Sequence, residues 1–170
     1  MKEIHNILFI CSGNLSRSPL AECVLRKMLA DNDVADITAS SAGTHNLTGM
    51  PRDEKMVAVA HQHGYNMGGN ACQMTRQMLL DADLILVMDQ YHIAKVQHEL
   101  PHEEWGKMYL FNEYCFGKQS EIEDPICGST AQNEQVFQNI ENGCRKIVEK
   151  LTGIVSDQPN AAQPPQGWFC

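Results

Sequence analysis

The sequence predicts an α/β fold in which a doubly wound sheet of four parallel strands is flanked by helices on both faces, giving three layers. The first observation is that short apolar runs alternate with longer stretches whose apolar residues recur at helical spacing. The second is the unbroken apolar run Leu84 to Met88 between Asp83 and Asp89, which is typical of a central parallel strand. Such sheets bind ligands beyond the carboxyl ends of their strands, so we expect the functional site there.

The first strand is expected from Ile4 to Ile10, and it ends at Cys11. Pro19 then stands in the first turn of a helix whose apolar residues run from Leu20 to Ala30. Further strands are expected over Val34 to Ser41, Leu84 to Met88 and Lys107 to Phe111, and further helices over Asp53 to His63, Thr75 to Leu80, Asp89 to Leu100 and Thr130 to Leu151. Residues 112 to 129 are predicted to form a long loop, and loops of that length tend to be functional.

The length of 170 residues fits one domain with a real core, and we expect it to cover residues 1–152. Residues 153–170 are polar and proline-bearing, which predicts a flexible tail. The formal net charge of -8 argues against nucleic acid or an anionic membrane as the main partner. Without a signal peptide or an apolar stretch long enough to span a membrane, we expect a cytoplasmic protein. Seven cysteines without zinc-like pair spacing argue against a disulfide scaffold or a structural metal.

The segment between the first strand and the first helix has the chemistry of an anion site. A strand, a tight loop and a helix N-terminus direct backbone N–H groups at one spot, and the helix dipole favours negative charge there. The same field stabilises a thiolate, so Cys11 is the candidate nucleophile. Arg17 offers a planar fork that can hold two phosphate oxygens. The candidate phosphate-binding residues are Ser12, Gly13, Asn14, Leu15, Ser16, Arg17 and Ser18.

The run Cys-Ser-Gly-Asn-Leu-Ser-Arg-Ser-Pro at residues 11 to 19 resembles the active-site signature of the low-molecular-weight protein tyrosine phosphatases, and Gly106 to Phe111 is similar to the bacterial members. The resemblance covers about residues 4 to 151 and continues, in the family's order, through Ser40 to Thr44, His63-Gly64, Asp83 to Asp89 and Asp124-Pro125. It implies a strand order of 2-1-3-4 and hydrolysis of phosphotyrosine through a cysteinyl phosphate, with no metal or other cofactor. It also implies a phosphotyrosine protein as partner, such as an autophosphorylating bacterial tyrosine kinase.

The resemblance also points to a general acid on the long loop. In the family, the aspartate that precedes a proline on this loop protonates the leaving phenolate, and here that residue is Asp124. A carboxyl group beside a phosphate dianion feels like-charge repulsion, which keeps its proton available for transfer. Glu123 is the alternative acid on the same loop.

The chain departs from the family's pattern inside and below the phosphate loop. Ser16 stands where the family usually has a second cysteine, so Cys11 is expected to lack a neighbouring thiol that could protect it from oxidation. Gly69 and Cys72 stand where the family has a histidine and an arginine. We expect this second change to remove one support of Asn14 and to loosen the loop.

The chain also departs from the pattern around the substrate pocket. The family's aromatic wall after Asp-Pro is replaced by Ile126-Cys127, and Leu47 stands where an aromatic residue is common. An aliphatic pocket accepts a phenyl ring without ring stacking, which contributes about 0.5 to 1.5 kcal/mol per aromatic pair. We therefore expect weaker or shifted substrate preference.

Three other functions share part of this pattern. Protein-arginine phosphatases resemble it but typically carry threonine at the position of Leu15. Thioredoxin-coupled arsenate reductases need two further cysteines near the exit of the third strand, and no cysteine lies between Cys72 and Cys115. A catalytically inactive phosphate-binding module would need neither the nucleophile nor the acid.

Overall fold

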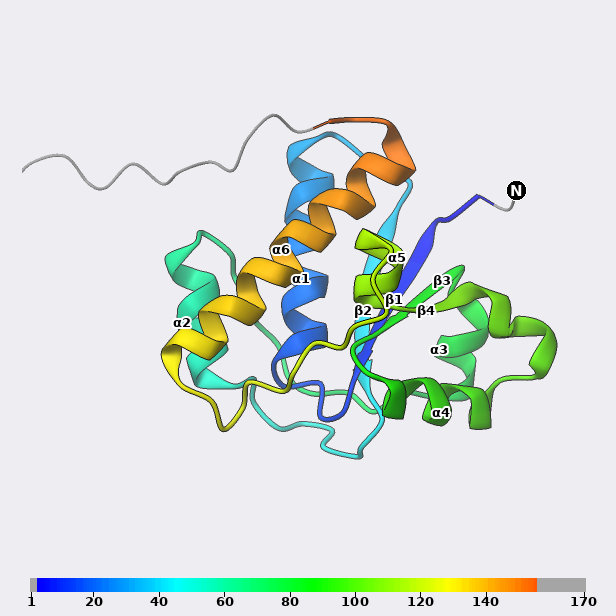
Figure 1. Cartoon of the computed structure of the whole chain (residues 1–170), viewed down its shortest axis with the longest axis horizontal. Helices are drawn as coiled ribbons and strands as arrows, with labels where there is room; N and C mark the ends of the chain where they lie inside the picture. Colours follow the sequence, from blue (N-terminus) through cyan, green and yellow to red (C-terminus); the bar gives the residue numbers. More distant parts are fainter. Residues whose placement is uncertain (1–2, 156–170) are drawn as a thin grey trace, which may run out of the picture.

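The computed structural model describes residues 3–155, which alternate strands and helices along the chain (Figure 1). The strands are β1 (Asn6–Cys11), β2 (Thr38–Gly43), β3 (Leu84–Val87) and β4 (Met108–Leu110). The helices are α1 (Arg17–Asp31), α2 (Glu54–Gln62), α3 (Arg76–Asp81), α4 (Gln90–Glu99), α5 (Phe111–Phe116), α6 (Thr130–Thr152) and the 3-10 helix η1 (His102–Lys107).

The four strands form one parallel sheet in the order β2-β1-β3-β4. The register pairs Cys11 of β1 with Gly43 of β2, and Ile10 with Val87 of β3. Val87 in turn pairs with Leu110 of β4, so the strands end along one edge of the sheet. The predicted fold class and strand order are confirmed, and Cys11 lies at the carboxyl edge where a parallel sheet binds ligands.

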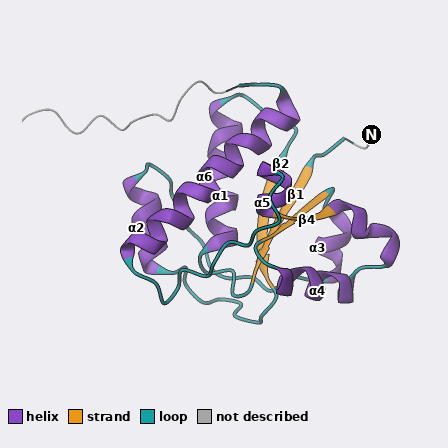
Figure 2. Cartoon of the chain, viewed as in Figure 1, coloured by secondary structure: helices purple, strands orange, loops and turns teal. Residues whose placement is uncertain are grey.

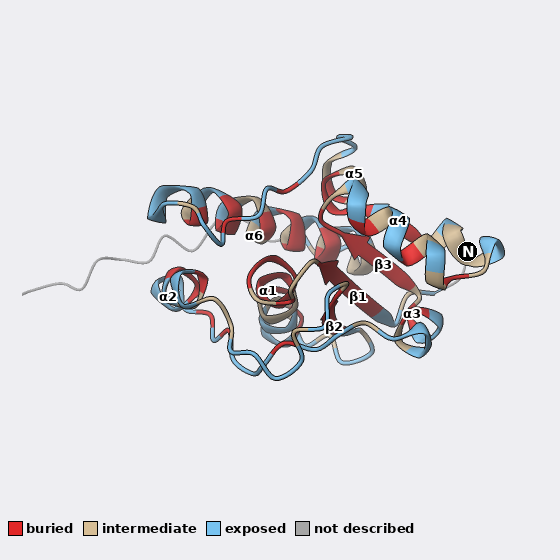
Figure 3. Cartoon of the chain, turned by 90° about the horizontal axis from the view of Figure 1, so that it is seen from below, coloured by how far each residue is buried: buried red, intermediate tan, exposed pale blue. Residues whose placement is uncertain are grey.

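Helices cover both faces of the sheet, as Figure 2 shows. Helices α1, α2, α5 and α6 share one apolar core with the sheet, and α3 and α4 share the other. Successive residues of β1 serve the two cores in turn, because side chains alternate across a strand: Phe9 faces α1 and α6, while Leu8 and Ile10 face α3 and α4. The strands are therefore buried on both sides, which is visible in Figure 3.

The predicted fourth strand and the loop after it are partly wrong. The strand is shorter than predicted, since Lys107 closes the helix η1 and Phe111 opens the helix α5. Phe111 and Cys115 lie one helical turn apart and are both buried against the core shared with α6. Tertiary packing thus makes a helix of six residues whose apolar pattern is too short to recognise from the sequence.

Other boundaries differ less. Strand β2 begins at Thr38 rather than Val34, because the N–H of Val34 donates to the carbonyl of Leu29 and closes a turn after α1. Within residues 3–155, none of the helices is long and apolar enough to cross a membrane. The predicted tail lies, from Ser156 onward, outside the described residues.

Candidate active site

Cys11 is the last residue of β1 and is buried beneath the loop that leads to α1. Its Sγ lies 2.9 Å from the hydroxyl Oγ of Ser18, in the first turn of α1. The sulfur therefore sits between the end of a parallel strand and the start of a helix, where the backbone dipoles favour a negative charge.

The loop over Cys11 is held by its carbonyl groups from outside. The carbonyl oxygens of Cys11 and Ser12 accept hydrogen bonds from the N–H groups of Thr44 and His45. The carbonyl of Asn14 accepts from the side chain of Arg52, and that of Leu15 accepts from the N–H of Asp53. The carbonyl of Ser16 accepts from the N–H of Leu20 in α1. In a trans peptide the N–H points opposite to the carbonyl. The N–H groups that follow these carbonyls therefore turn toward the inside of the loop, as an oxyanion site requires.

Asn14 carries the left-handed turn of this loop, with φ 55°, and it is fully buried. Its Nδ2 donates to Ser18 Oγ and Ser41 Oγ, each at 2.9 Å. Its Oδ1 accepts from Arg52 Nη1 at 2.8 Å and from the N–H of Cys72 at 2.9 Å. All four hydrogen-bonding positions of the amide are used, which fixes the loop conformation.

The expectation that Gly69 and Cys72 leave Asn14 poorly supported is therefore wrong. Cys72 contributes its backbone N–H, which does not depend on the side chain. Arg52 supplies a side-chain donor from a different segment of the chain. This contact could not be predicted from the sequence, because Arg52 belongs to no recognisable pattern.

Arg17 is almost fully buried and joins the loop to two other parts of the site. Its Nη1 donates to the carboxylate of Asp89 at 3.2 Å and to the carbonyl of Ile122 at 2.8 Å. Its Nη2 donates to Asp124 at 3.1 Å. Asp89, which follows β3, thus orients the guanidinium, and the predicted phosphate clamp Arg17 lies in contact with the predicted acid Asp124.

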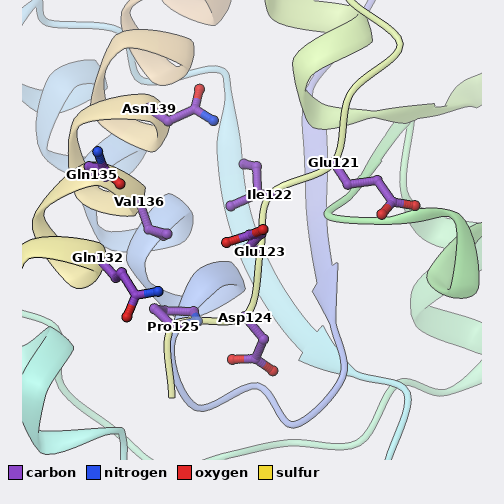
Figure 4. Close-up of a pocket in the computed structure, with 9 residues that line it drawn as sticks. All are labelled: Glu121, Ile122, Glu123, Asp124, Pro125, Gln132, Gln135, Val136 and Asn139. Carbon is purple, nitrogen blue, oxygen red and sulfur yellow. The ribbon is translucent and has the colours of Figure 1, made fainter. Parts of the chain in front are cut away.

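Asp124 lies on the segment between α5 and α6, and Figure 4 shows it at the lower end of that segment. The segment and α6 face each other across a small pocket of about 160 Å³, lined by residues that include Ile122, Pro125 and Val136. One carboxylate oxygen of Asp124 binds Arg17 and the other accepts from the N–H of Ile126 at 3.2 Å. The structure brings Asp124 to Arg17; Glu123 is exposed beside it and has no such contact.

Ser12, the first residue of the loop, is bonded to a buried histidine of α4. His92 Nδ1 accepts from the N–H of Asp89 at 3.2 Å, so in the neutral ring Nε2 carries the proton and donates to Ser12 Oγ at 2.9 Å. Burial lowers the pKa of His92 to about 4, although the nearby Asp89 carboxylate acts in the opposite direction. At neutral pH the ring is therefore an uncharged bridge between α4 and the loop.

Two aromatic side chains lie next to the residues that bind Ser12, and the sequence analysis did not single them out. His45, whose N–H binds the Ser12 carbonyl, packs edge-on against Tyr91 with ring centroids 6.1 Å apart. Tyr91 is half exposed and precedes His92, which binds the other side of Ser12. Ile126 is also exposed near Asp124. The lack of an aromatic wall at Ile126-Cys127 and Leu47 stays a prediction, and the pair of His45 and Tyr91 adds aromatic rings near Ser12.

Three other cysteines, the partly buried Cys23 and the buried Cys115 and Cys144, lie in surroundings that disfavour a thiolate. Burial raises the pKa of Cys23 and that of Cys115 to about 12, and it raises the pKa of Cys144 well above its ordinary value. Unlike Cys11, none of these three lies beneath an anion-binding loop.

Comparison with known proteins agrees with this site. The family model described as "Low molecular weight phosphotyrosine protein phosphatase" matches residues 6–156. The chain belongs to this family. Its members are phosphomonoester hydrolases, and the resemblance noted in the sequence is confirmed.

Three relatives illustrate the match. AmsI of Erwinia amylovora, named a probable low molecular weight protein-tyrosine-phosphatase, is 37% identical over 150 residues, covering 88% of this chain and 99% of that protein. Its crystal structure matches with a TM-score of 0.78 at 35% identity, over 88% of this chain and 94% of that chain. The structure of Wzb of Vibrio vulnificus in complex with benzylphosphonate matches with a TM-score of 0.77 at 31% identity, covering 87% of this chain and 99% of that chain. The YwlE arginine phosphatase of Geobacillus stearothermophilus shares the fold. Its structure matches with a TM-score of 0.80 at 23% identity, covering 88% of this chain and 94% of that chain.

Proposed function

We propose that this enzyme hydrolyses phosphotyrosine in proteins through a cysteinyl-phosphate intermediate, with Cys11 as nucleophile, Arg17 as phosphate clamp and Asp124 as general acid and base. The observation that supports this best is the contact between Arg17 and Asp124, which places a carboxyl group from a distant loop beside the phosphate loop. The loop N–H groups and Arg17 would bind the three equatorial oxygens of the phosphoryl group. The scheme uses only groups of the chain and needs no metal.

The reaction has two steps. In the first, the Cys11 thiolate attacks phosphorus, a P–S bond forms, the P–O bond to the phenol breaks, and Asp124 gives its proton to the departing oxygen. In the second, water attacks phosphorus, the P–S bond breaks, and the Asp124 carboxylate takes the proton of the water. Phosphate leaves and the thiolate is restored.

The partner is a phosphotyrosine protein in this proposal. By resemblance to bacterial members, we propose an autophosphorylating tyrosine kinase as a substrate and the cytoplasm as the place of action. Two features near the loop support an aryl substrate. The first is the aromatic pair of His45 and Tyr91. The second is the apolar pair of Leu15 and Leu47, which both lie close to Gly13: a Cβ added to Gly13 would be 3.0 Å from Leu47 and 3.3 Å from Leu15.

The test compares wild type with Cys11→Ser, Asp124→Ala and Glu123→Ala on two aryl phosphates. Cys11→Ser should abolish turnover. Asp124→Ala should lower kcat by about 10²- to 10⁴-fold, with the larger loss for phenyl phosphate than for p-nitrophenyl phosphate, because nitrophenolate leaves without a proton. Glu123→Ala should act like wild type, and EDTA should change none of the rates. Equal losses on both substrates would exclude Asp124 as the acid.

Phosphoarginine serves as the competing substrate. Leu15 offers the guanidinium no hydrogen-bond acceptor, so we expect turnover far below that of aryl phosphates, and Leu15→Thr should narrow the difference. Comparable turnover by wild type would assign the chain to the arginine phosphatases instead.

A further inference from the structure

Arg52 contacts the phosphate loop from outside, although it lies in the loop before α2 and is 38 residues from Asn14 in the chain. Its Nη1 donates to both the backbone carbonyl and the side-chain Oδ1 of Asn14. Its Nε donates to the carbonyl of Gly68 at 3.1 Å. One guanidinium therefore ties the left-handed residue of the loop to the segment that follows α2.

The guanidinium lies next to Gly69. This glycine has φ +77°, and an added Cβ would lie 3.6 Å from Arg52 Nη2. A larger side chain at this position would compete with the guanidinium for the volume below Asn14.

Arg52 is linked to the sulfur through two side chains: it donates to Asn14, Asn14 Nδ2 donates to Ser18 Oγ, and Ser18 Oγ lies 2.9 Å from Cys11 Sγ. Burial lowers the pKa of Arg52, while the negative charges of Glu22 and of a Cys11 thiolate raise it. Such an interaction is reciprocal, so a thiolate that favours the charged arginine is itself favoured by that charge. Arg17 is paired with the carboxylates of Asp89 and Asp124, whereas Arg52 donates hydrogen bonds to the uncharged oxygens of Asn14 and Gly68.

We propose that Arg52 is a positioning residue that keeps the phosphate loop closed through Asn14 and that its charge stabilises the thiolate of Cys11. The proposal deepens the proposed function, since it concerns the same loop. Its test reads thiolate reactivity and phosphate binding, which do not require turnover, so its failure can be told from a failure of the phosphatase assignment.

The experiment measures the rate of Cys11 alkylation by iodoacetamide against pH, with the labelled peptide identified by mass spectrometry, and the Kd of inorganic phosphate. Arg52→Gln keeps a side-chain donor without the charge, Arg52→Lys keeps the charge without the fork, and Arg52→Ala removes both. Arg76→Gln is the control, because Arg76 is an exposed arginine of α3 that binds the carbonyl of Glu99.

We expect the pH midpoint of alkylation to rise by about one unit in Arg52→Gln and Arg52→Ala, to rise less in Arg52→Lys, and to stay unchanged in Arg76→Gln. The Kd of phosphate should rise about tenfold in Arg52→Ala, since the loss of one charged hydrogen-bond donor costs about 1.4 kcal/mol or more. If Arg52→Gln and Arg52→Ala both kept the wild-type pH profile of alkylation and the wild-type Kd of phosphate, the proposal would be overturned. Equal pH midpoints of alkylation in Arg52→Lys and Arg52→Gln would overturn the role of the charge.

Discussion

At the scale of single residues, the hydrogen bonds around Cys11 run from Asn14 through Ser18. Asn14 Nδ2 donates to Ser18 Oγ, so the hydroxyl hydrogen of Ser18 points to one of two acceptors, Cys11 Sγ at 2.9 Å or the more distant carbonyl of Ala42 at 3.4 Å. A donor at this distance favours the thiolate over the thiol. The Asn14 amide thus acts on the sulfur through Ser18 without touching it.

Ser16 leads to a prediction about oxidation. Its Oγ is buried and has no hydrogen-bond partner within the described chain, and Cys11 has no cysteine neighbour in the loop. Peroxide should therefore inactivate wild type through sulfinic or sulfonic acid, with little recovery by dithiothreitol. Ser16→Cys should recover most of its activity by forming a disulfide with Cys11, which peptide mass spectrometry would detect. Full recovery of wild type from a Cys11 disulfide would contradict this.

Tyr91 leads to a prediction about substrate preference. We expect its ring, which packs against His45, to contact the aryl group of the substrate. Tyr91→Ala should then raise KM for p-nitrophenyl phosphate roughly two- to tenfold, since one aromatic contact contributes about 0.5 to 1.5 kcal/mol. Tyr91→Phe should act like wild type. KM for an alkyl phosphate should not change in either variant, and a parallel rise there would mean that the substitution disturbs the loop itself.

At this scale the residues of the loop itself were easier to name from the sequence than the side chains that support the loop. Cys11, Arg17 and Ser18 could be named because they lie in one short stretch beside a strand and a helix. Arg52 and His92 could not be named, because each reaches the loop from a segment whose own pattern shows nothing about Asn14 or Ser12.

At the scale of elements, the end of β2 shapes the loop by close approach. A Cβ on Gly43 would lie 2.7 Å from the carbonyl oxygen of Ser12 and 2.9 Å from the N–H nitrogen of Asn14. These are backbone atoms that cannot move without opening the loop. Gly43→Ala should therefore lower kcat/KM for aryl phosphate at least tenfold, while Gly106→Ala, with nothing within 4 Å, should not. Unchanged kcat/KM in Gly43→Ala would show that the loop is not held against β2.

Helix α4 leads to a prediction about pH. The pKa of His92 is about 4 in the folded protein against an ordinary 6.5, so between these values the unfolded chain binds a proton that the folded chain does not. The free energy of unfolding should fall as the pH drops below about 6.5, and this group should contribute a loss of about 3 kcal/mol by pH 4. Above pH 6.5, His92 should contribute no pH dependence to the free energy of unfolding.

The matched variant is His92→Gln, because glutamine at this position can still accept from the N–H of Asp89 as in a capping box. Urea midpoints measured between pH 7 and pH 4 should fall less steeply in this variant than in wild type. Equal slopes would mean that His92 is protonated in the folded protein as readily as in the unfolded chain.

The elements themselves were largely predictable, with one instructive exception. The unbroken apolar run of β3 between two aspartates and the helical spacing of apolar residues along the 23 residues of α6 each identify the type of element. Helix α5 depends instead on two buried side chains, Phe111 and Cys115, that pack against α6. Its sequence is only six residues long, and contacts with a later element decide its conformation.

At the scale of the whole molecule, the site is assembled from distant segments that meet at the carboxyl edge of the sheet. The Arg17 and Asp124 side chains lie 107 residues apart in the chain and 3.1 Å apart in space. Arg17 also binds Asp89, which follows β3. An anion that binds Arg17 should therefore stabilise the entire fold and not the loop alone.

Phosphate should accordingly raise the thermal stability of the folded chain. At a phosphate concentration of 100 times its Kd, the free energy of unfolding should increase by about 2.7 kcal/mol, which corresponds to about 5 to 10 °C in Tm. Cys11→Ser should keep the shift, since the loop N–H groups and Arg17 remain. Arg17→Gln should lose most of it, whatever its own Tm, and chloride at equal ionic strength should produce little shift. An undiminished shift in Arg17→Gln would mean that phosphate binds elsewhere, because no other charged side chain in the described loop at residues 11–18 could replace the guanidinium.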